Sequence, residues 1–480
     1  MDRLGRRGLL AALALALGQL ACAPPAATPA PTPRPGKTSG AGQTTPDRAS
    51  ATPTADVPPT AIPAPTSPPA TPTGVATTAT AGAGPSPPAK EVERLDRVAK
   101  VLPGIDVLLA ERLDLVAGRR VGLVTNPTGV TAGGTSGVDA LHGRPELRLV
   151  ALFGPEHGIR GDAEGGAAVA STTDWRTGLP VYSLYGETRR PTAEMLRDLD
   201  VLLFDVQDVG VRFYTYVSTL AYVMQAAAAH GKRVVVLDRP NPIGGLAVEG
   251  PVLEHGQESF VGLYPIALRH GMTVGELACL FNEEFGIHCD LAVVPAAGWR
   301  RSLWFDRTGL RWVPPSPNIR TLDSATVYPC TGMLEGTNVS EGRGTPRPFE
   351  NVGAPWIDGE RWARALSGLG LPGVEFQPTW FMPDSSKYRG ERCGGVFLVV
   401  ADRERFRPVE TGLSIVATAL RLYPEHFAWQ AGGGFDLLVG NAWLRRRLAA
   451  GAEVGELAQA WQARLDEFRS LRQRYLLYPV

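Results

Sequence analysis

Residues 147–162 read LRLVALFGPEHGIRGD, and this stretch is the most informative one in the sequence. Its first part, Leu147–Phe153, is a short apolar run of the kind that forms a buried strand. One proline and three glycines follow within nine residues and end the strand in a loop. Loops at the carboxyl ends of parallel strands are where α/β proteins bind ligands. Glu156 is therefore our first candidate for chemistry, with His157 and Asp162 in the same loop; the ordinary alternative is a turn with a solvated glutamate.

Apolar runs alternate with helical segments through the first part of the folded chain. The predicted strands are Arg120–Thr125, Leu147–Phe153, Val201–Asp205, Arg233–Asp238 and Leu291–Pro295. The predicted helices are Thr192–Arg197, Val211–Ala229 and Thr273–Phe285. This alternation predicts an α/β fold with a Rossmann-like, doubly wound parallel sheet.

After Trp299 the pattern becomes irregular and rich in proline and glycine. It retains a predicted strand at Gly395–Ala401 and predicted helices at Gly412–Leu422 and Val454–Tyr475. We therefore predict a Rossmann-like catalytic domain over residues 101–298 and a smaller α+β auxiliary domain over residues 299–480 that completes the cleft.

The first 92 residues show no pattern of a folded domain. Residues 1–22 join a basic head to an apolar core, Leu9–Leu17, that is too short for a permanent membrane span, so they are predicted to be an export signal of lipoprotein type ending at Cys22. Residues 23–92, rich in Pro, Thr, Ala, Ser and Gly, are predicted to be a disordered tether. We expect an exported protein of the cell envelope or the medium, attached to a membrane only through a lipid on Cys22.

The composition argues against several partners and cofactors. Lys+Arg and Asp+Glu each number 48, so the charge gives no reason to expect nucleic acid or an anionic membrane surface as a partner. The cysteines have no C-x-x-C spacing, and no metal site is predicted. G-x-G-x-x-G, G-x-x-x-x-G-K-[ST] and H-E-x-x-H are all missing, so no cofactor is predicted.

Polar residues follow four of the predicted strands. They are Asn126 after the first, Glu156 and His157 after the second, Asp205, Gln207 and Asp208 after the third, and Asp238, Arg239 and Asn241 after the fourth. Because the carboxyl ends of parallel strands share one edge of the sheet, these residues predict a crevice suited to a polyhydroxylated ligand. Arg212, Tyr214 and Tyr216 open the long helix that follows and are expected at the same rim. Ordinary packing is the alternative for the two tyrosines.

A second polar segment, Leu334–Thr345, lies in the predicted auxiliary domain. Its small and polar residues predict a loop that carries Glu335, Asn338, Glu341 and Arg343. Arg343 stands between two glycines and is free to bind an anion, and a solvated loop with an interdomain ion pair is the alternative.

The longest motifs together resemble one family. They are Gly154-Pro155-Glu156-His157-Gly158, Asp205-Val206-Gln207-Asp208-Val209-Gly210 with Arg212-Phe213-Tyr214-Thr215-Tyr216, Asp238-Arg239-Pro240-Asn241-Pro242, Arg269-His270-Gly271-Met272-Thr273, and Glu335-Gly336-Thr337-Asn338 with Ser340-Glu341-Gly342-Arg343-Gly344-Thr345. From about Leu102 to the carboxyl end, the chain resembles the exo-acting β-N-acetylmuramidases of the NamZ type. The resemblance implies a Rossmann-like domain, an auxiliary domain, and a site in the cleft between them. It also implies release of N-acetylmuramic acid from the non-reducing ends of peptidoglycan fragments, with Glu156 at the position of the family's glutamate.

Glycoside hydrolysis generally needs two carboxyl groups, one to protonate the leaving oxygen and one to act at the anomeric carbon. Glu156 can take one of these roles. For the other, Asp208, Asp162 and Glu341 compete, Tyr214 or Tyr216 can assist, and the substrate's own acetamido group is a further option. Muramic acid differs from glucosamine by a lactyl carboxylate, so Arg343 or Arg212 is the expected selector.

The motifs Arg269-His270-Gly271 and Glu335 to Arg343 add further candidate substrate-binding residues, among them Arg269, His270 and Asn338. Two other functions remain open at this point. One is a tethered, noncatalytic receptor for cell-wall sugars that uses the same crevice. The other is an envelope esterase or amidase with Ser340 as nucleophile and His270 as base.

Overall fold

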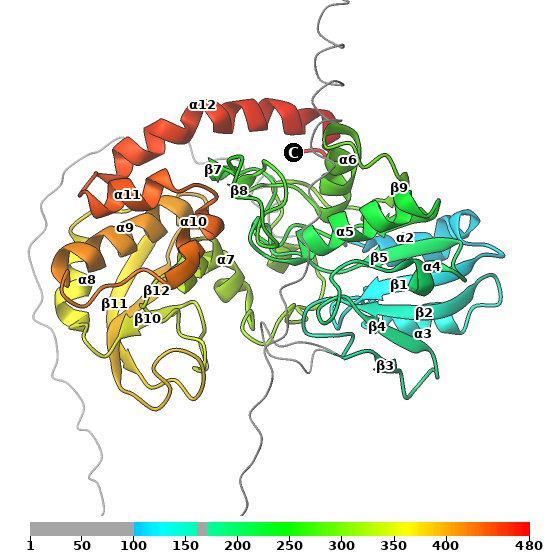
Figure 1. The fold of residues 1–480 in the computed structure, drawn as a ribbon, viewed down its shortest axis with the longest axis horizontal. Helices are drawn as coiled ribbons and strands as arrows, with labels where there is room; N and C mark the ends of the chain where they lie inside the picture. The colour runs from blue at the N-terminus through cyan, green and yellow to red at the C-terminus, as the bar shows by residue number, and fades with distance from the viewer. Residues whose placement is uncertain (1–99, 161–169) are drawn as a thin grey trace, which may run out of the picture. The chain divides into compact units, whose positions relative to one another are not determined.

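The computed structural model describes residues 100–160 and 170–480. The predicted export signal, Cys22, the tether and Asp162 lie outside the described residues. The main sheet has the order β3-β4-β2-β1-β5-β6-β9 (Figure 1). Its strands are β1 (Arg120–Thr125), β2 (Arg148–Gly154), β3 (Thr172–Thr173), β4 (Pro180–Ser183), β5 (Val201–Asp205), β6 (Arg233–Leu237) and β9 (Asp290–Val294).

All neighbouring strands in this sheet are parallel except the edge pair β3 and β4. If β3 is left out and the other six strands are numbered in chain order, their order across the sheet is 3-2-1-4-5-6, which is the order of a Rossmann fold. The prediction of an α/β, Rossmann-like sheet is therefore confirmed, and the five strands predicted for this sheet agree with the observed ones to within one residue at either end.

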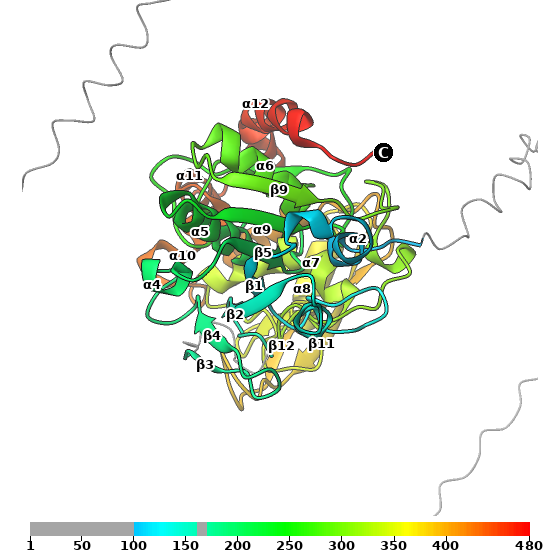
Figure 2. The same ribbon diagram turned by 90° about the vertical axis from the view of Figure 1, so that its right-hand side faces the viewer.

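Both faces of the sheet are buried against apolar cores. Successive side chains of each strand point to opposite sides, so each strand contributes to both cores. In β5, Val201 and Leu203 belong to one apolar core and Leu202 and Phe204 to the other. The first core is covered by α2 (Gly104–Glu111) and α3 (Gly137–His142), and the second by α4 (Ala193–Leu196), α5 (Tyr216–Ala229) and α6 (Val274–Glu284). Figure 2 shows α4 and α5 on one side of the strands and α2 on the other.

The prediction of a helix from Val211 was wrong for its first five residues, because α5 begins at Tyr216. Val211 instead forms a β-bridge with Arg269, and the backbone N–H of Arg212 donates to the carbonyl oxygen of Leu268. Gly210, with φ +82°, sets the direction of this segment. The segment therefore joins the two-stranded sheet of β7 (Glu249–Val252) and β8 (Ala267–Arg269).

The remaining residues build the predicted α+β part around a three-stranded antiparallel sheet of order β10-β12-β11. These strands are β10 (Asn351–Ala354), β11 (Val374–Phe381) and β12 (Cys393–Val400). The helices are α7 (Leu322–Thr331), α8 (Gly359–Ser367), α9 (Pro408–Leu422), α10 (Gly434–Val439), α11 (Trp443–Ala449) and α12 (Val454–Arg472). Short 3₁₀ turns follow α7 at Gly332–Gly336 and α12 at Gln473–Tyr475.

Among residues 100–160 and 170–480, no helix combines the length and the apolar character that crossing a bilayer requires.

Candidate active site

Glu156 lies in a tight turn directly after β2. The backbone N–H of Gly158 donates to the carbonyl oxygen of Pro155 at 2.9 Å, and His157, inside this turn, has φ +72°. That conformation is uncommon for a residue with a side chain, and such residues cluster at functional sites. Gly154 permits the turn, since a Cβ there would lie 3.2 Å from the Cα of Gly158. The backbone therefore fixes Glu156 at the carboxyl edge of the sheet.

Hydroxyl groups orient the Glu156 carboxylate. Thr215 Oγ1 donates to Glu156 Oε2 at 2.6 Å. The pKa of Tyr185 is raised to about 12, first by burial and then by the charge of Glu156 and a hydrogen bond to it. The hydroxyl of Tyr216 donates to the carbonyl oxygen of Pro315 at 2.6 Å and lies 3.4 Å from the backbone oxygen of Glu156. The start of α5 thus holds both the side chain and the backbone of Glu156, and Tyr185 contacts the side chain from the loop after β4.

A cavity of about 670 Å³ opens in front of Glu156. Such a volume is ordinary for a small-ligand site. Of the residues predicted from the sequence, the cavity is lined by Glu156, His157, Tyr214, Glu335, Glu341 and Arg343. The structure therefore brings the loop after β2 and the segment after α7 together around one space.

Glu335, Glu341, Arg343 and Lys387 form a charged network on the wall of the cavity. Arg343 donates from Nη2 to Glu335 Oε1 at 2.7 Å and lies with Nε 3.2 Å from Glu341 Oε1. Lys387 Nζ donates to Glu341 Oε2 at 2.9 Å and to the carbonyl oxygens of Leu334 and Val339. Both basic groups are thus paired within the network, and Arg343 already has carboxylate partners from its own chain.

Burial raises the pKa of Glu335 and outweighs the opposing charge of Arg343. Glu335 lies on the 3₁₀ turn that follows α7, and Gly336 lets this turn approach α10, since a Cβ there would be 2.4 Å from the backbone N of Phe435. Gly342, with φ +74°, turns the chain between Glu341 and Arg343, and Arg343 then contacts both Glu335 and Glu341. Two of the glutamates that line the cavity therefore lie in different surroundings: Glu156 among hydroxyls, and Glu335, whose side chain is 33% exposed, beside the guanidinium of Arg343.

Several strand-end residues lie away from the cavity and pair with one another. Asp205 is fully buried and accepts from Arg239 Nε at 2.6 Å, and burial raises its pKa. Asn126 Oδ1 accepts from the backbone N–H of Thr128, while Gln207 Nε2 donates to the carbonyl oxygens of Asp208 and Pro240. These side chains lie at the carboxyl edge of the sheet, where the strand order reverses between β1 and β5. The protein's own side chains therefore fill the part of the edge where the sequence predicted a crevice.

Asp208 and His270 are both buried and face each other, with His270 Nε2 3.4 Å from Asp208 Oδ2. Ser340 Oγ accepts from the backbone N–H of Gly342. None of these three side chains lines the cavity, and no contact joins Ser340 to His270.

Arg212, Arg269 and Asn338 also support the fold away from the cavity. Arg212 is buried and donates to the carbonyl oxygens of Pro251, Ile266 and Leu438, and burial lowers its pKa to about 9. Arg269 donates to Glu249 at 2.6 Å. Asn338 exchanges hydrogen bonds with the backbone of His426 and Ala428.

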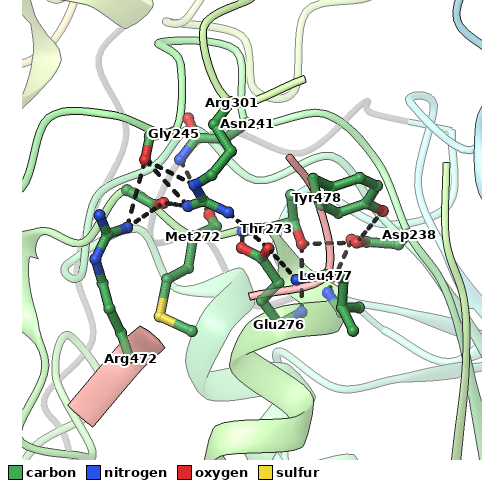
Figure 3. A network of polar contacts seen from close by, with 12 residues as sticks. Asp238, Asn241, Gly245, Met272, Thr273, Glu276, Arg301, Arg472, Leu477 and Tyr478 are labelled. Carbon is green, nitrogen blue, oxygen red and sulfur yellow. Dashed lines mark hydrogen bonds and ion pairs between the residues drawn. The ribbon is translucent and has the colours of Figure 1, made fainter. Parts of the chain in front are cut away.

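Asp238 and Asn241 belong to a buried polar network that fixes the end of the chain (Figure 3). The hydroxyl of Tyr478 donates to Asp238 Oδ2 at 2.6 Å, and burial raises the pKa of Asp238 to about 6. The backbone N–H of Leu477 donates to Glu276, and Asn241 Nδ2 donates to the carbonyl oxygen of Met272. This motif therefore docks the carboxyl-terminal tail in the structure.

Sequence reasoning missed several residues that line the cavity. They are Tyr185, Thr215, Ser316–Arg320, Tyr328 and Asp384–Lys387. Thr215 lies inside a motif that the sequence analysis singled out, so its place beside the tyrosines was a usable signal. Tyr328 lies on α7, and the others come from loops with no distinctive composition. In residues 100–160 and 170–480, no three His, Cys, Asp or Glu side chains gather as a metal ion would require.

The fold and the cavity define a class: a Rossmann-ordered α/β domain joined to an α+β domain, with a site lined by carboxylates from both. Sequence models of the exo-β-N-acetylmuramidase NamZ N-terminal and C-terminal regions match residues 121–323 and 326–478. The chain therefore belongs to the NamZ exo-β-N-acetylmuramidase family. The predicted division at residue 298 stays a prediction.

Individual relatives agree with this assignment. The chain is 51% identical over 401 residues to the peptidoglycan β-N-acetylmuramidase NamZ of Bacillus subtilis, covering 84% of this chain and 96% of that one. Two crystal structures of DUF1343-family proteins from Bacteroides fragilis are similar. The first has 41% identity and a TM-score of 0.75, and covers 80% of this chain and 100% of its own. The second has 30% identity and a TM-score of 0.66, and covers 79% and 99%.

Proposed function

We propose that this protein is an exo-acting glycoside hydrolase that releases N-acetylmuramic acid from the non-reducing ends of peptidoglycan fragments. The observation that carries the proposal is the cavity in which Glu156, oriented by Thr215 and Tyr185, shares the lining with Glu335. Family membership and the relative named as a peptidoglycan β-N-acetylmuramidase support the choice of substrate.

The two glutamates differ in a way that suits the two roles of glycoside hydrolysis. Glu335 has a raised pKa, so it retains a proton to higher pH and suits the acid that protonates the leaving oxygen. Glu156 accepts hydroxyl hydrogen bonds and suits the carboxylate that acts at the anomeric carbon, either directly or through water. Glu341 is paired with both Arg343 and Lys387, whereas Glu335 is paired with Arg343 alone, and Asp208 lies outside the cavity lining, so we assign the second role to Glu335.

The direct test uses the full-length purified protein with nitrophenyl β-N-acetylmuramide and its β-N-acetylglucosaminide counterpart. Turnover of the muramide, with little or none of the glucosaminide, is the expected result. Binding of muramyl saccharides without turnover would favour a tethered receptor instead. The esterase alternative has no support from the geometry, because Ser340 and His270 are buried apart from the cavity.

Arg320 is the cavity-lining guanidinium best placed to bind the lactyl carboxylate. Its Nε donates to the carbonyl oxygen of Pro317, and no carboxylate of the described residues lies within ion-pair distance of it. Arg343 and Lys387, in contrast, are paired with Glu335 and Glu341. A hydrogen bond to a charged group contributes about 1.5–3 kcal/mol, so Arg320→Ala should lower kcat/KM for the muramide by about 10- to 100-fold.

The same variant should hardly change the residual kcat/KM for the glucosaminide, which has no lactyl group. Arg320→Lys should fall between the wild type and Arg320→Ala, because it keeps the charge and loses the planar fork. Arg343→Ala is the matched comparison and should lower activity on both substrates, since it leaves Glu335 and Glu341 without their shared partner. Loss confined to the muramide in Arg343→Ala, with none in Arg320→Ala, would return the selector role to Arg343.

We propose that the protein is exported and anchored by a lipid on Cys22, with residues 23–92 as the tether. The proposal rests on the sequence pattern of the first 92 residues alone. The protein should fractionate with membranes, and Cys22→Ala should move it to the soluble fraction or the medium. A wild-type protein found in the medium, with the same distribution for Cys22→Ala, would show that the signal is simply cleaved.

A further inference from the structure

A cluster of aromatic rings and arginines adjoins the cavity. This ring–arginine cluster comprises Tyr185, Arg189, Arg190, Tyr222 and Phe260. Its residues come from the loop between β4 and α4, from α5, and from the loop between β7 and β8. Tyr185 lines the cavity and hydrogen-bonds to Glu156, and Val261, next to Phe260, lines the cavity as well. The cluster is therefore continuous with the site.

The rings hold both guanidinium groups in place. The Cζ atom of Arg189 lies 4.2 Å from the centroid of Phe260 and 5.4 Å from that of Tyr185. Arg190 Cζ lies 4.4 Å from the centroid of Tyr222, whose ring stacks on Phe260 at 5.8 Å with an interplanar angle of 22°. A guanidinium stacked on a ring is ordered in advance, while the N–H donors at its edge stay open to a carboxylate.

Neither arginine has an acidic partner among the described residues. Both side chains are exposed, and no carboxylate of residues 100–160 and 170–480 lies within ion-pair distance of them. Glu187, the one acid in the sequence between β4 and α4, forms no ion pair with either. The cluster thus presents two positive charges beside the cavity that no acid of the described residues pairs with, whereas Arg343 and Lys387 inside it are paired with Glu335 and Glu341.

We propose that the ring–arginine cluster binds a carboxylate on the part of the saccharide beyond the bond that is cleaved, namely the lactyl group of the next muramyl unit. The proposal rests on the proposed function. An exo-acting enzyme holds the terminal unit in its cavity, so the rest of the fragment must leave past the residues at the opening. The cluster begins at Tyr185, which contacts Glu156, and extends away from it through Phe260 to Tyr222. A bidentate arginine is the usual partner of a carboxylate.

The test compares three substrates on the full-length protein. The first is the disaccharide of N-acetylmuramic acid and N-acetylglucosamine, which has no second lactyl group. The second is the corresponding tetrasaccharide, and the third is that tetrasaccharide with its second lactyl carboxylate converted to an amide. We expect the wild type to prefer the tetrasaccharide about tenfold in kcat/KM over both others. This corresponds to the low end of the free energy that a hydrogen bond to a charged group contributes, because the contact is exposed to solvent.

In Arg189→Ala the ratio of kcat/KM for the tetrasaccharide to that for the disaccharide should fall about tenfold, to near one, with Arg189→Lys in between. Arg421→Ala is the control, since Arg421 is exposed on α9 and does not line the cavity, and it should leave the ratio unchanged. A wild-type ratio near one, a preference that survives amidation, or a ratio unchanged in Arg189→Ala would each overturn the proposal. Turnover of the nitrophenyl muramide by the wild type would still support the proposed function in those cases, whereas its failure would remove both.

Discussion

Glu156→Gln should lower kcat/KM by about two orders of magnitude or more on both the nitrophenyl muramide and the muramyl disaccharide, the scale of a lost acid–base or nucleophilic group. Glutamine keeps the shape of the side chain and an oxygen that can accept from Thr215, which donates to Glu156 at 2.6 Å. The turn that holds the residue depends on Gly154 and on the backbone of His157, neither of which the substitution changes. The loss should therefore come from the chemistry rather than from the fold.

Thermal unfolding and equilibrium binding of a muramyl saccharide separate these two causes. Both should stay close to the wild-type values in Glu156→Gln, while steady-state kinetics records the loss in kcat. Glu194→Gln is a matched control, because Glu194 is exposed on α4, away from the cavity lining, and this variant should behave as the wild type. Near-normal turnover in Glu156→Gln would remove Glu156 from the mechanism.

The position of Glu156 could be predicted from the sequence because two independent rules agree on it. An apolar run that stops at glycine and proline predicts a strand end, and the parallel arrangement predicts which edge of the sheet that end reaches. The structure has β2 ending at Gly154 and Glu156 lining the cavity. Glu335, Glu341 and Arg343 could be found for a similar reason, since a long polar loop with two glycines stands out against its surroundings.

The same rule does not show which strand-end residues reach the cavity. Asp205 and Arg239 look in sequence like Glu156 and His157, because all follow apolar runs at the same edge. In the structure the loop after β1 folds over the edge, and a Cβ on Gly129 would lie 3.2 Å from Asp205 Oδ2. The carboxylate is closed off and pairs with Arg239. The sequence alone does not distinguish an acidic side chain that is available to a ligand from one that forms an ion pair within the protein. In both cases an acid follows a strand and has polar residues near it.

Tertiary contacts also explain what the sequence reading missed. Tyr185 and Ser316–Arg320 lie in connections without periodicity, and they become part of the site only when both halves of the chain meet at the cavity. The motif Asp238–Asn241 shows the reverse error, because the sequence placed it at the site and the structure places it against the carboxyl-terminal tail. Asp238 is a conspicuous acid after a strand, yet its oxygens accept from Thr273 and Tyr478, and Tyr478 lies 240 residues further along the chain. Local pattern has no information on a partner at that separation.

Glu335→Gln should separate the two catalytic roles through the leaving group. If Glu335 protonates the leaving oxygen, its loss should lower kcat/KM for the muramyl disaccharide by about 10²- to 10⁴-fold. Without that proton the sugar has to leave as an alkoxide, which is a strong base and a poor leaving group. Nitrophenolate is a weak base and leaves without a proton, so the loss on the nitrophenyl muramide should be about tenfold or less. Glu156→Gln, in contrast, should be impaired on both.

The pH dependence of disaccharide turnover gives a second readout. Glu335 must be protonated to act, and burial raises its pKa, so wild-type activity should persist above the pH at which an ordinary glutamate loses its proton. Activity should then fall as pH rises through that raised pKa. In Glu335→Gln this basic limb should vanish from the remaining activity, because the amide does not titrate.

Glu341→Gln is the matched control, since Glu341 belongs to the same charged network and contacts both Arg343 and Lys387. That variant disturbs the wall of the cavity and should lower activity on the disaccharide and the nitrophenyl muramide alike, with the basic limb retained. A Glu335→Gln variant with equal losses on both substrates would make Glu335 a partner that positions Arg343. Only a loss that depends on the leaving group, together with loss of the basic limb, identifies Glu335 as the proton donor. The two carboxyl groups of the mechanism would then come from opposite halves of the chain, Glu156 from the parallel sheet and Glu335 from the turn after α7.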